Sequence, residues 1–577
     1  MNCGQAVAAP KLTKARTTSA TLPTEVGAIE ASSQLAGERR VVTVLFADIS
    51  GFTAMSENMD PEQLRSLMND CFDRLVPIVE KYEGTVDKFI GDEIMALFGA
   101  PTAHEDDPAR ALRVALEFMD TLAQFNAEYG TDLGMHAGIN TGLVVAGGIG
   151  SQGRQQYSVM GDTVNLASRL ESASERGEIF VGPDTHRATA PLFEFETLSP
   201  IQVKGKADPV QVYKLLGSKR EPDQVRGLVG LESPMVGRDP ELKALLKLSS
   251  ALQSGQGSVA TIIGEAGLGK SRLSKEWRAS ARSKIENNTS VTWIEGRCLS
   301  YGQGLAYHLV TDMLYTLIGV PPASDEAQTR IALWDFIEAH FGADTLEVYP
   351  YLGHMLSLQI EGEARDRIQR LDPQSLQNYY FSSLRQLFQK VATQNPVGFI
   401  FEDTHWADPS STDLIIKLMP LTNEIPLLFC FVTRPDYDAP GWKLVTTARD
   451  TFSHSLTELN LQTLSTTDSR QIISNLLEIE SLPEEIRNVI LARSEGNPFF
   501  VEEVIRMLID RGAIIKEGHR WIACEQINGV EIPDNLQGLL LARIDRLPED
   551  IKHTLRVASV IGRQFSVKVL EEVLQGA

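Results

Sequence analysis

The N-terminal part of the chain contains short apolar runs that predict β-strands. Residues 41–47 (VVTVLFA) are almost continuously apolar, which is typical of a strand buried on both faces. Residues 84–90 and 94–98 predict a hairpin, because Gly91 and Asp92 between them supply a turn that presents the aspartate outward. These runs therefore predict a sheet that contains at least one hairpin.

Apolar stripes at helical spacing separate these strands. One stripe follows Asp60, which fits the N-cap of a helix with proline at its first position. Helices are also expected over residues 108–129 and 162–173. Between them a strand over 135–140 is expected to end in a turn at Asn140-Thr141-Gly142. Strands and helices interleaved around an antiparallel sheet predict an α+β domain.

Two aspartates lie where this pattern ends a strand or turns a hairpin. Asp48 ends the first strand, and Ser50 and Gly51 then turn the chain tightly, so that successive N–H groups can face an anion. Asp92 lies at the hairpin tip. Magnesium prefers one or two carboxylates together with phosphate oxygens, and a two-metal site can activate a hydroxyl and neutralise a triphosphate. Asp48 alone would be read as a turn residue, whereas the pair indicates a metal-dependent nucleotide site.

A polar linker at residues 218–233 separates this pattern from a second one. An amphipathic helix is expected over 241–252 and a buried strand over 258–263. The sequence GEAGLGKS follows that strand directly and opens a helix, which is the context that a P-loop requires. Its glycines let backbone N–H groups surround phosphates, while Lys270 reaches the outer phosphates and Ser271 can hold a metal.

Two more buried strands complete the expected second nucleotide site. Residues 397–401 lead into Glu402 and Asp403, an acidic pair of the Walker B type. Residues 427–432 lead into Thr433 and Arg434, and an arginine at that strand end could sense the outer phosphate. This second pattern predicts an α/β P-loop domain.

Length and composition narrow the class of protein. At 577 residues the chain should hold three or four domains, and its formal net charge of −22 argues against a main role in binding nucleic acid or anionic lipid. Five cysteines without a CxxC motif fit a reducing cytoplasm. No apolar run reaches the roughly 18 residues of a membrane span. Residues 1–38 predict a disordered tail, with a transit peptide as the alternative.

Residues 39–217 resemble the class III nucleotidyl cyclases. Four motifs in the first pattern carry the resemblance: FADISGFT, KFIGDEIMALFG, GINTG and YSVMGDTVNLASRLE. The resemblance implies a ferredoxin-like core and an active site between two cyclase domains of a homodimer, with two Mg²⁺ or Mn²⁺ ions per site. It implies metal ligands at Asp48, Ile49 and Asp92, and ribose and transition-state contacts from Asn165 and Arg169. It implies phosphate contacts from Ile49, Phe52, Thr53 and Lys204 or Lys206.

The same resemblance implies that Lys88 and Ser158 read the base. Adenine presents an acceptor at N1 and a donor at N6, so that Lys88 can donate and Ser158 can accept, whereas guanine presents the reverse. A hydroxyl can also donate, so discrimination should be weaker than with the aspartate of many adenylyl cyclases. Serine there resembles the soluble, bicarbonate-responsive subgroup, which implies bicarbonate as a candidate activator. Leu143 departs from members that carry arginine after the Thr-Gly turn, and Arg154 is a candidate substitute.

The second pattern resembles the STAND branch of AAA-related NTPases. The motifs that carry this resemblance are GEAGLGKS, FIFEDTHWADPSS, VTRP and EGNPFFVEEV. The expected domains are an NTPase at 234–484 and a helical, winged-helix-like region at 485–577. Because relatives often continue into helical repeats, the chain is expected to be a shortened protein or a fragment. Whether Glu402 or Asp403 leads at the metal stays open, as does whether His405 and Trp406 are functional or structural. The implied ATP site consists of Gly264, Glu265, Ala266, Gly267, Leu268, Gly269, Lys270, Ser271, Glu402, Asp403, Arg434 and Pro498.

The sequence therefore predicts a cytoplasmic, homodimeric adenylyl cyclase that converts ATP to 3′,5′-cyclic AMP and pyrophosphate. Its fused NTPase is expected to bind ATP and to regulate the cyclase, with an upstream signal and a signalling partner that the sequence does not identify. One alternative is a guanylyl cyclase, which Lys88 opposes. The other is a catalytically silent scaffold or sensor, which the intact Asp48, Asp92, Asn165 and Arg169 oppose.

Overall fold

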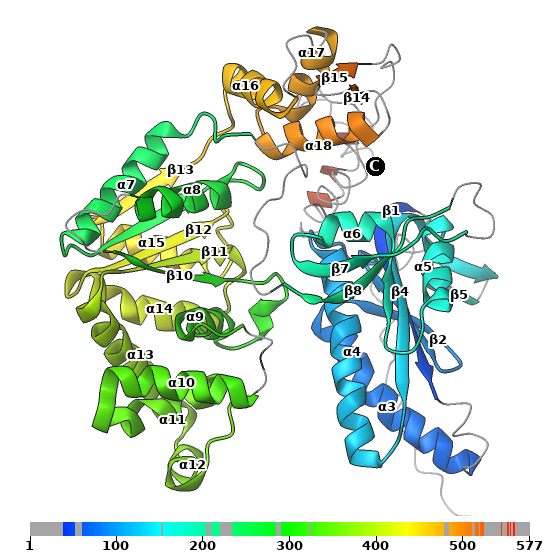
Figure 1. The fold of residues 1–577 in the computed structure, drawn as a ribbon, viewed down its shortest axis with the longest axis horizontal. Helices are drawn as coiled ribbons and strands as arrows, with labels where there is room; N and C mark the ends of the chain where they lie inside the picture. The colour runs from blue at the N-terminus through cyan, green and yellow to red at the C-terminus, as the bar shows by residue number, and fades with distance from the viewer. Residues whose placement is uncertain are drawn as a thin grey trace, which may run out of the picture.

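The computed structural model describes most of the chain between Glu38 and Ala523. The described residues are 38–51, 60–151, 154–202, 209–219, 233–283, 290–321, 326–477, 484–510, 514–517 and 520–523, with a few isolated positions besides. The predicted tail, the linker between the two patterns and the end of the chain therefore fall wholly or largely outside the described residues. In Figure 1 the N-terminal sheet lies on the right and the P-loop domain on the left.

The N-terminal domain is built on an eight-stranded sheet with β1 (Glu38–Ser50) near its centre. β1 is antiparallel to both of its neighbours, β3 and β4, which confirms the expected buried strand. β2 and β3 form the predicted hairpin around Gly91 and Asp92. The strand order is β2-β3-β1-β4-β6-β8-β7, with β5 paired to β4. The remaining strands are β2 (Thr85–Ile90), β3 (Glu93–Phe98), β4 (Gly134–Ser151), β5 (Arg154–Met160), β6 (Ile179–Val181), β7 (Phe193–Thr197) and β8 (Tyr213–Ser218).

Helices cover both faces of this sheet, and the alternation of side chains along β1 assigns each residue to a face. Leu45, Ala47 and Ile49 pack in the core with α3 (Pro61–Lys81) and α4 (Asp107–Tyr129). Val44 and Phe46 face the other way, into a second core that includes a residue of α5 (Asp162–Ala173). Because side chains alternate along a strand, Asp48 emerges on the face of α5 and not on the face of α3 and α4.

The expected turn at Asn140-Thr141-Gly142 is wrong. β4 runs through these residues and pairs with β1 from Gly134 to Ala146. Gly142 serves a close approach instead, since a Cβ there would lie 2.6 Å from Thr163 Oγ1 at the start of α5. Asn140 Nδ2 donates to Thr163 O at 3.2 Å and so ties the same helix end to the strand.

The second domain is an α/β unit with a five-stranded parallel sheet in the order β10-β11-β12-β9-β13. Every described residue of β9, β11 and β12 is buried, as the apolar runs predict. The strands are β9 (Ser258–Ile263), β10 (Thr292–Arg297), β11 (Val397–Glu402), β12 (Leu427–Thr433) and β13 (Leu456–Asn460). Helices α7 (Asp239–Gln253) and α8 (Lys270–Ser283) cover one face of the sheet (Figure 1). The other helices are α9 (His308–Ile318), α10 (Glu326–Phe341), α11 (Thr345–Met355), α12 (Gly362–Gln369), α13 (Pro373–Gln394), α14 (Pro409–Leu418) and α15 (Trp442–Thr451).

A smaller helical unit follows the sheet. It consists of α16 (Thr466–Leu477), α17 (Glu484–Ser494) and α18 (Pro498–Asp510), then a hairpin of β14 (Ile514–Glu517) and β15 (Arg520–Ala523). Its own apolar core includes Ile473, Ile490 and Val501. Helices followed by a hairpin agree with the expected helical region.

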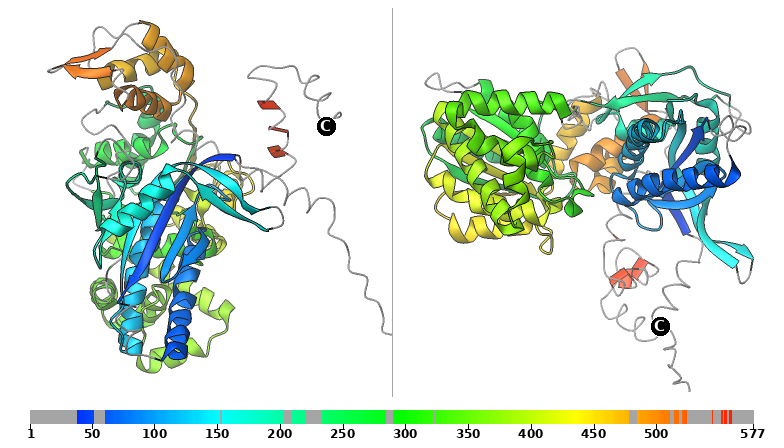
Figure 2. Two further views of the ribbon diagram at one scale, coloured as in Figure 1. Left: turned by 90° about the vertical axis from the view of Figure 1, so that its right-hand side faces the viewer. Right: turned by 90° about the horizontal axis from the view of Figure 1, so that it is seen from below.

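The two large domains contact each other through residues 299–301 and through the pair of Glu105 with Arg434. Tyr301 of the P-loop domain belongs to the core of the N-terminal domain, where its ring lies 4.7 Å from that of Tyr82. The fully buried Arg110 donates to Ser300 Oγ at 2.5 Å, and Ser300 in turn donates to Asp106 at 2.8 Å. The right-hand view of Figure 2 shows the two domains side by side.

Cys71, Cys298 and Cys430 are buried free thiols, in agreement with the expected absence of a disulfide framework among the described cysteines. Within the described residues, none of the helices combines the length and the apolar character needed to span a bilayer.

Candidate active sites

The first candidate site is a cluster of carboxylates at the end of β1. Asp48 is half-buried and lies opposite Glu93 of β3 and His136 of β4 in the strand register. His136 Nε2 lies 2.9 Å from Glu171 Oε1 of α5 and 3.8 Å from Asp48 Oδ2. Asp92 lies in the β2–β3 turn next to Glu93, and its negative charge acts on Asp48 and Glu93. Asp48 therefore lies in this cluster, and Asp92 lies near enough for its charge to act on Asp48.

The charges in this cluster fit a divalent cation. Burial raises the pKa of Asp48, and the Asp92 carboxylate raises it further, while His136 opposes the shift. Burial raises the pKa of Glu93 to about 7, with Glu171, Asp48 and Asp92 adding to the effect. Carboxylate oxygens are the ligands that magnesium prefers, and a cation would relieve this crowding of negative charge. Ligand atoms of Asp48, His136 and Glu171 also lie within 4.8 Å of one another.

Sequence reasoning missed Glu93, His136 and Glu171. Glu93 and Glu171 lay inside motifs that were used for other residues, and nothing in the sequence marked His136. The side chain of Ile49 is 1% exposed and packs in the core, so only its backbone could meet a metal or phosphate. Phe52, Thr53, Lys204 and Lys206 lie outside the described residues, and their roles stay predictions.

Asn165 and Arg169 project from α5. They are one helical turn apart, so they share a face of the helix. Asn165 is exposed and Arg169 is half-buried, whereas Leu166 and Leu170 are buried and anchor the helix. This arrangement leaves both polar side chains available to a ligand or to a second chain.

The predicted base-reading residues lie side by side. Lys88 Nζ on β2 is 3.4 Å from Ser158 Oγ on β5, although 70 positions separate them in the chain. Both contact Asp87, whose side chain is 1% exposed. Ser158 Oγ donates to Asp87 Oδ2 at 3.0 Å, and Lys88 Nζ lies 3.0 Å from the same oxygen. Asp87 was not among the residues that the sequence singled out.

The second candidate site is the P-loop between β9 and α8. Gly267 and Gly269 have positive φ angles of 80° and 88°, which a P-loop needs and other residues rarely adopt. Lys270 is 7% exposed, and its Nζ donates to Glu265 O at 3.1 Å. Burial lowers the pKa of Lys270 to about 8; Arg434 lowers it further, whereas Asp403 and Glu402 oppose the shift. A buried ammonium of this kind is suited to a phosphate.

Glu402 and Asp403 are placed differently, although which of them leads at a metal stays a prediction. Ser271 Oγ donates to Glu402 Oε2 at 2.9 Å, and Ser274 Oγ donates to Glu402 Oε1 at 2.5 Å. Glu402 is the last residue of β11, while Asp403 has a left-handed backbone with φ of 57°. Glu402 is therefore the carboxylate placed beside the P-loop serine.

Arg434 lies next to the P-loop because β12 is the neighbour of β9 in the sheet. Thr433 pairs with Ile263, and Gly264 N donates to Thr433 O at 3.2 Å. The Arg434 guanidinium lies 5.3 Å from the ring centre of Trp406, so Trp406 supports this arginine. Trp406 thus lies beside the site, and whether its role is functional or structural stays open.

Two further segments brace the P-loop. Asn497 Nδ2 donates to Ala266 O at 3.0 Å, which holds the Gly496-Asn497-Pro498 turn against the loop. The buried Arg238 donates to Leu268 O at 3.2 Å. Arg238 was not among the residues that the sequence singled out. The contact of Pro498 with a nucleotide base stays a prediction.

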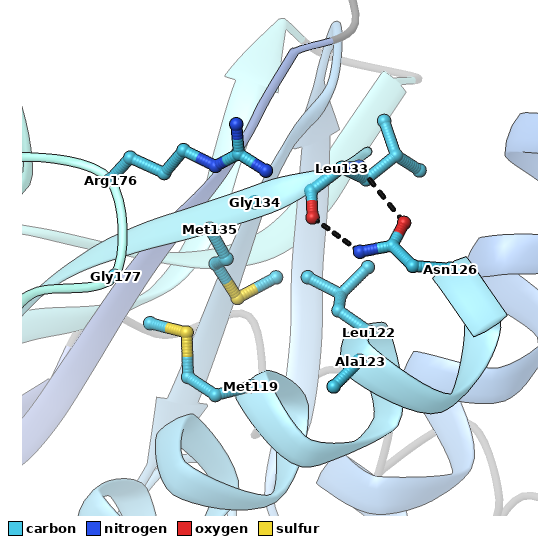
Figure 3. A pocket seen from close by; sticks show the side chains of 9 residues that line it. All are labelled: Met119, Leu122, Ala123, Asn126, Leu133, Gly134, Met135, Arg176 and Gly177. Atoms are coloured by element: carbon cyan, nitrogen blue, oxygen red, sulfur yellow. Dashed lines mark hydrogen bonds between the residues drawn. The ribbon is translucent and has the colours of Figure 1, made fainter. Parts of the chain in front are cut away.

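A pocket of about 300 Å³ lies apart from both sites, between α4 and the start of β4 (Figure 3). Met119, Leu122 and Met135 supply its apolar wall, and Asn126 bonds to the backbone of Leu133. Met135 belongs to the core under α3 and α4, whereas Asp48 and His136 emerge on the other face of the sheet. The pocket is therefore not part of the carboxylate site.

Comparison with known families assigns three domains along the chain. Residues 36–217 match the adenylate and guanylate cyclase catalytic domain, residues 234–431 match the AAA ATPase domain, and residues 465–520 match a domain of unknown function. Cyclase domains of this family use magnesium or manganese and bind a nucleotide, which the carboxylate cluster fits.

Individual relatives match either most of the chain or the cyclase domain. An uncharacterised protein of Rhizobium meliloti is 25% identical over 94% of this chain and 50% of its own length. Adenylate cyclase 1 of the same organism is 32% identical over 32% of this chain and 28% of its own length. The crystal structure of the guanylyl cyclase Cya2 is 38% identical over 33% of this chain and 98% of its own, with a TM-score of 0.31. The chain thus spans half or less of the length of these two curated relatives.

Proposed function

Because the chain carries a class III nucleotidyl cyclase domain followed by an AAA-type ATPase domain, we propose that it is an adenylyl cyclase under the control of its ATPase domain. The reaction forms a bond between the ribose 3′-oxygen and the α-phosphorus of ATP and releases pyrophosphate. The observation that carries the choice of ATP is the pairing of Lys88 Nζ with Ser158 Oγ at 3.4 Å. Lys88 matches the acceptor N1 of adenine, whereas guanine would require a carboxylate at that position.

In this proposal each group of the carboxylate site has a task. Asp48 and Asp92 hold the metal ions, with Glu93, His136 and Glu171 around them. Bound Mg²⁺ or Mn²⁺ would lower the pKa of the 3′-hydroxyl and balance the triphosphate charge. Asn165 orients the ribose. Arg169 stabilises the negative charge that develops on the pentavalent phosphorus.

We further propose that the site is completed by a second copy of the chain. An exposed apolar strip on β4 and β5 of the same sheet consists of Leu143, Val145 and Met160, which are 38–59% exposed. Phe89 and Ile90 are further exposed apolar residues on the edge strand β2. Val145 and Met160 lie directly opposite each other in the β4–β5 ladder. A patch of this kind is typical of a protein–protein interface and supports a homodimer through the cyclase domain.

The substrate choice is tested with the full chain. Initial rates of cyclic nucleotide formation are measured with ATP and with GTP in the presence of Mg²⁺ or Mn²⁺. We expect cyclic AMP to be the main product. A preference for GTP would replace the proposal by a guanylyl cyclase. No product from either nucleotide, in a protein shown to be folded and dimeric, would favour a signalling scaffold.

The ATPase domain is expected to act on the cyclase. Lys270→Ala removes the buried ammonium of the P-loop and should abolish nucleotide binding there, while it leaves Asp48, Lys88 and Arg169 untouched. If nucleotide biases two states of the chain, cyclic AMP formation at saturating ATP should change by about fivefold or more. Rates of the two proteins are compared at equal dimer content.

Lys275→Ala is the matched control for this variant. Lys275 is an exposed lysine on the same helix, and its replacement should change neither nucleotide binding nor cyclic AMP formation. Equal cyclase rates for the native protein and Lys270→Ala, with binding at the P-loop lost, would leave two independent modules in one chain.

A further inference from the structure

The buried carboxylate of Asp87 touches both base-reading residues. Its Oδ2 accepts a hydrogen bond from Ser158 Oγ at 3.0 Å and lies 3.0 Å from Lys88 Nζ. The pairing of β2 with β3 shifts register between Val86 and Lys88, so that a bulge interrupts the regular alternation. Consecutive residues can therefore engage the same site, which regular alternation would prevent.

This contact settles the hydrogen-bonding role of Ser158. A serine hydroxyl has one proton and two lone pairs, and an ionised carboxylate can only accept. Because Ser158 gives its proton to Asp87, the hydroxyl has only lone pairs left for other partners. One of them faces Lys88 Nζ at 3.4 Å. A ligand that meets Ser158 therefore meets an acceptor.

We propose that Asp87 is the positioning residue that makes Ser158 select adenine, on the premise that the chain is the nucleotidyl cyclase proposed above. The 6-amino group of adenine donates to Ser158, whereas the 6-oxo group of guanine would place two acceptors against each other. A free hydroxyl discriminates poorly between the two bases, because it can turn and donate. The Asp87 carboxylate prevents this turn by accepting the hydroxyl proton. Lys88, held by the same carboxylate, keeps its donor towards N1.

The test is Asp87→Asn in the full chain. Asparagine keeps the shape of the side chain and can keep an oxygen towards Ser158 and Lys88, but this oxygen is uncharged. It holds the hydroxyl proton of Ser158 less firmly than the carboxylate does, so the hydroxyl can turn and donate to guanine. We expect the ratio of kcat/KM for ATP to that for GTP to fall by about tenfold. The reason is that the acceptor against acceptor contact, which disfavours guanine by about tenfold or more, is relieved when the hydroxyl can donate. Part of the change should be a gain in rate with GTP, which damage to the structure would not produce.

Two further variants keep the test decisive. Ser158→Ala should lower kcat/KM for ATP without lowering it for GTP, and adding Asp87→Asn to it should leave the ratio unchanged. An unchanged ratio in a folded Asp87→Asn protein, or an equal loss with both nucleotides, would overturn the role of Asp87. If Asp87→Asn does not fold, an equal loss in Ser158→Ala would do the same. A native protein that cyclises neither nucleotide would instead contradict the proposed function.

An independent observation concerns the contact between the two domains at Arg434. Its two terminal nitrogens lie 2.5 Å and 2.6 Å from the two carboxylate oxygens of Glu105, which belongs to the cyclase domain. The side chains are 15% and 9% exposed. Arg434 stands beside the P-loop at the end of β12, where an outer phosphate is expected. Fork-like pairing of guanidinium with carboxylate uses the same geometry as its pairing with phosphate.

We infer that Glu105 occupies Arg434 in place of a nucleotide phosphate and is displaced when a nucleoside triphosphate fills the P-loop. The neighbouring Asp106 and Arg110 bind Ser300 of the P-loop domain. Release of Glu105 would therefore change the contact between the two domains. Binding of triphosphate and binding of Glu105 to Arg434 then oppose each other, and this coupling is reciprocal. The pair of Glu105 with Arg434 is therefore a contact through which the proposed regulation would operate.

The experiment measures nucleotide binding and needs no cyclase activity. Affinity for a non-hydrolysable ATP analogue is taken as the component of binding that Lys270→Ala removes. Glu105→Gln should raise this affinity about tenfold, because the bound triphosphate no longer displaces a charged partner. Affinity for ADP should change little, since Arg434 serves the outer phosphate. Glu128→Gln, an exposed glutamate on α4, is the control and should change neither.

The sign of the change decides the inference. Unchanged or weaker binding of the triphosphate analogue in Glu105→Gln would overturn it, as would an equal gain for ADP. If Glu105→Gln does not fold, Arg434→Lys tests the same contact. Lysine keeps the charge but not the fork, so the preference for triphosphate over ADP should fall. A preserved preference would contradict the role of Arg434.

Discussion

Replacement of Asp48 or Asp92 by alanine is expected to abolish cyclic nucleotide formation, with a loss of about a thousandfold or more. In the proposed site each aspartate supplies part of the negative charge that holds the metal ions. Burial raises the pKa of Asp48 and the Asp92 carboxylate raises it further, as expected if both belong to one site. Initial rates at saturating ATP and Mg²⁺ measure the loss, and thermal unfolding verifies the fold. Removal of metal from the native protein by a chelator should have the same effect and be reversed by added Mg²⁺.

Asp132→Ala provides the control for these variants. The Asp132 side chain is 88% exposed and pairs with Arg176 at the surface of the same domain, so its loss should leave activity close to the native value. Substantial activity in a folded Asp48→Ala or Asp92→Ala protein would remove these residues from the metal site. Glu93, Glu171 and His136 would then be the remaining candidates for ligands.

Mixing two inactive variants is expected to restore activity. In a dimer of Asp48→Ala with Arg169→Ala, one site combines the intact Asp48 of one chain with the intact Arg169 of the other. Random pairing of equal amounts makes half of the dimers mixed, each with one of two sites intact, so we expect about a quarter of the native rate. Subunit exchange is verified with differently tagged chains before cyclic AMP is measured.

The control is a mixture of Asp48→Ala with Asp92→Ala. Both residues contribute to the same side of the site, so neither site of a mixed dimer has both aspartates, and no activity should return. No recovery in verified mixed dimers of Asp48→Ala with Arg169→Ala would indicate sites built within single chains. Recovery in the control would instead indicate that the two aspartates of one site come from different chains. The apolar strip around Val145 and Met160 would then need another partner.

The local features of both sites could be predicted from the sequence because short-range rules produce them. The hairpin around Gly91 and Asp92, the start of α3 after Asp60 and the P-loop all depend on neighbours in the chain. The same rules misread Asn140-Thr141-Gly142, because a glycine serves a turn and a close approach equally well. Only the position of α5, packed 2.6 Å from where a Cβ would stand on Gly142, decides between them.

The sequence by itself determined the family motifs and the first candidate residues, because a P-loop or a strand-end aspartate is recognised by its immediate context. The tertiary structure alone decided which of them meet. The register of β1 with its neighbours brings Glu93 and His136 to Asp48, and the bulge in β2 turns Asp87 towards Ser158. Glu105 reaches Arg434 across 329 positions of the chain. Such pairs leave no periodic trace in a single sequence, since their cause is the packing of distant elements.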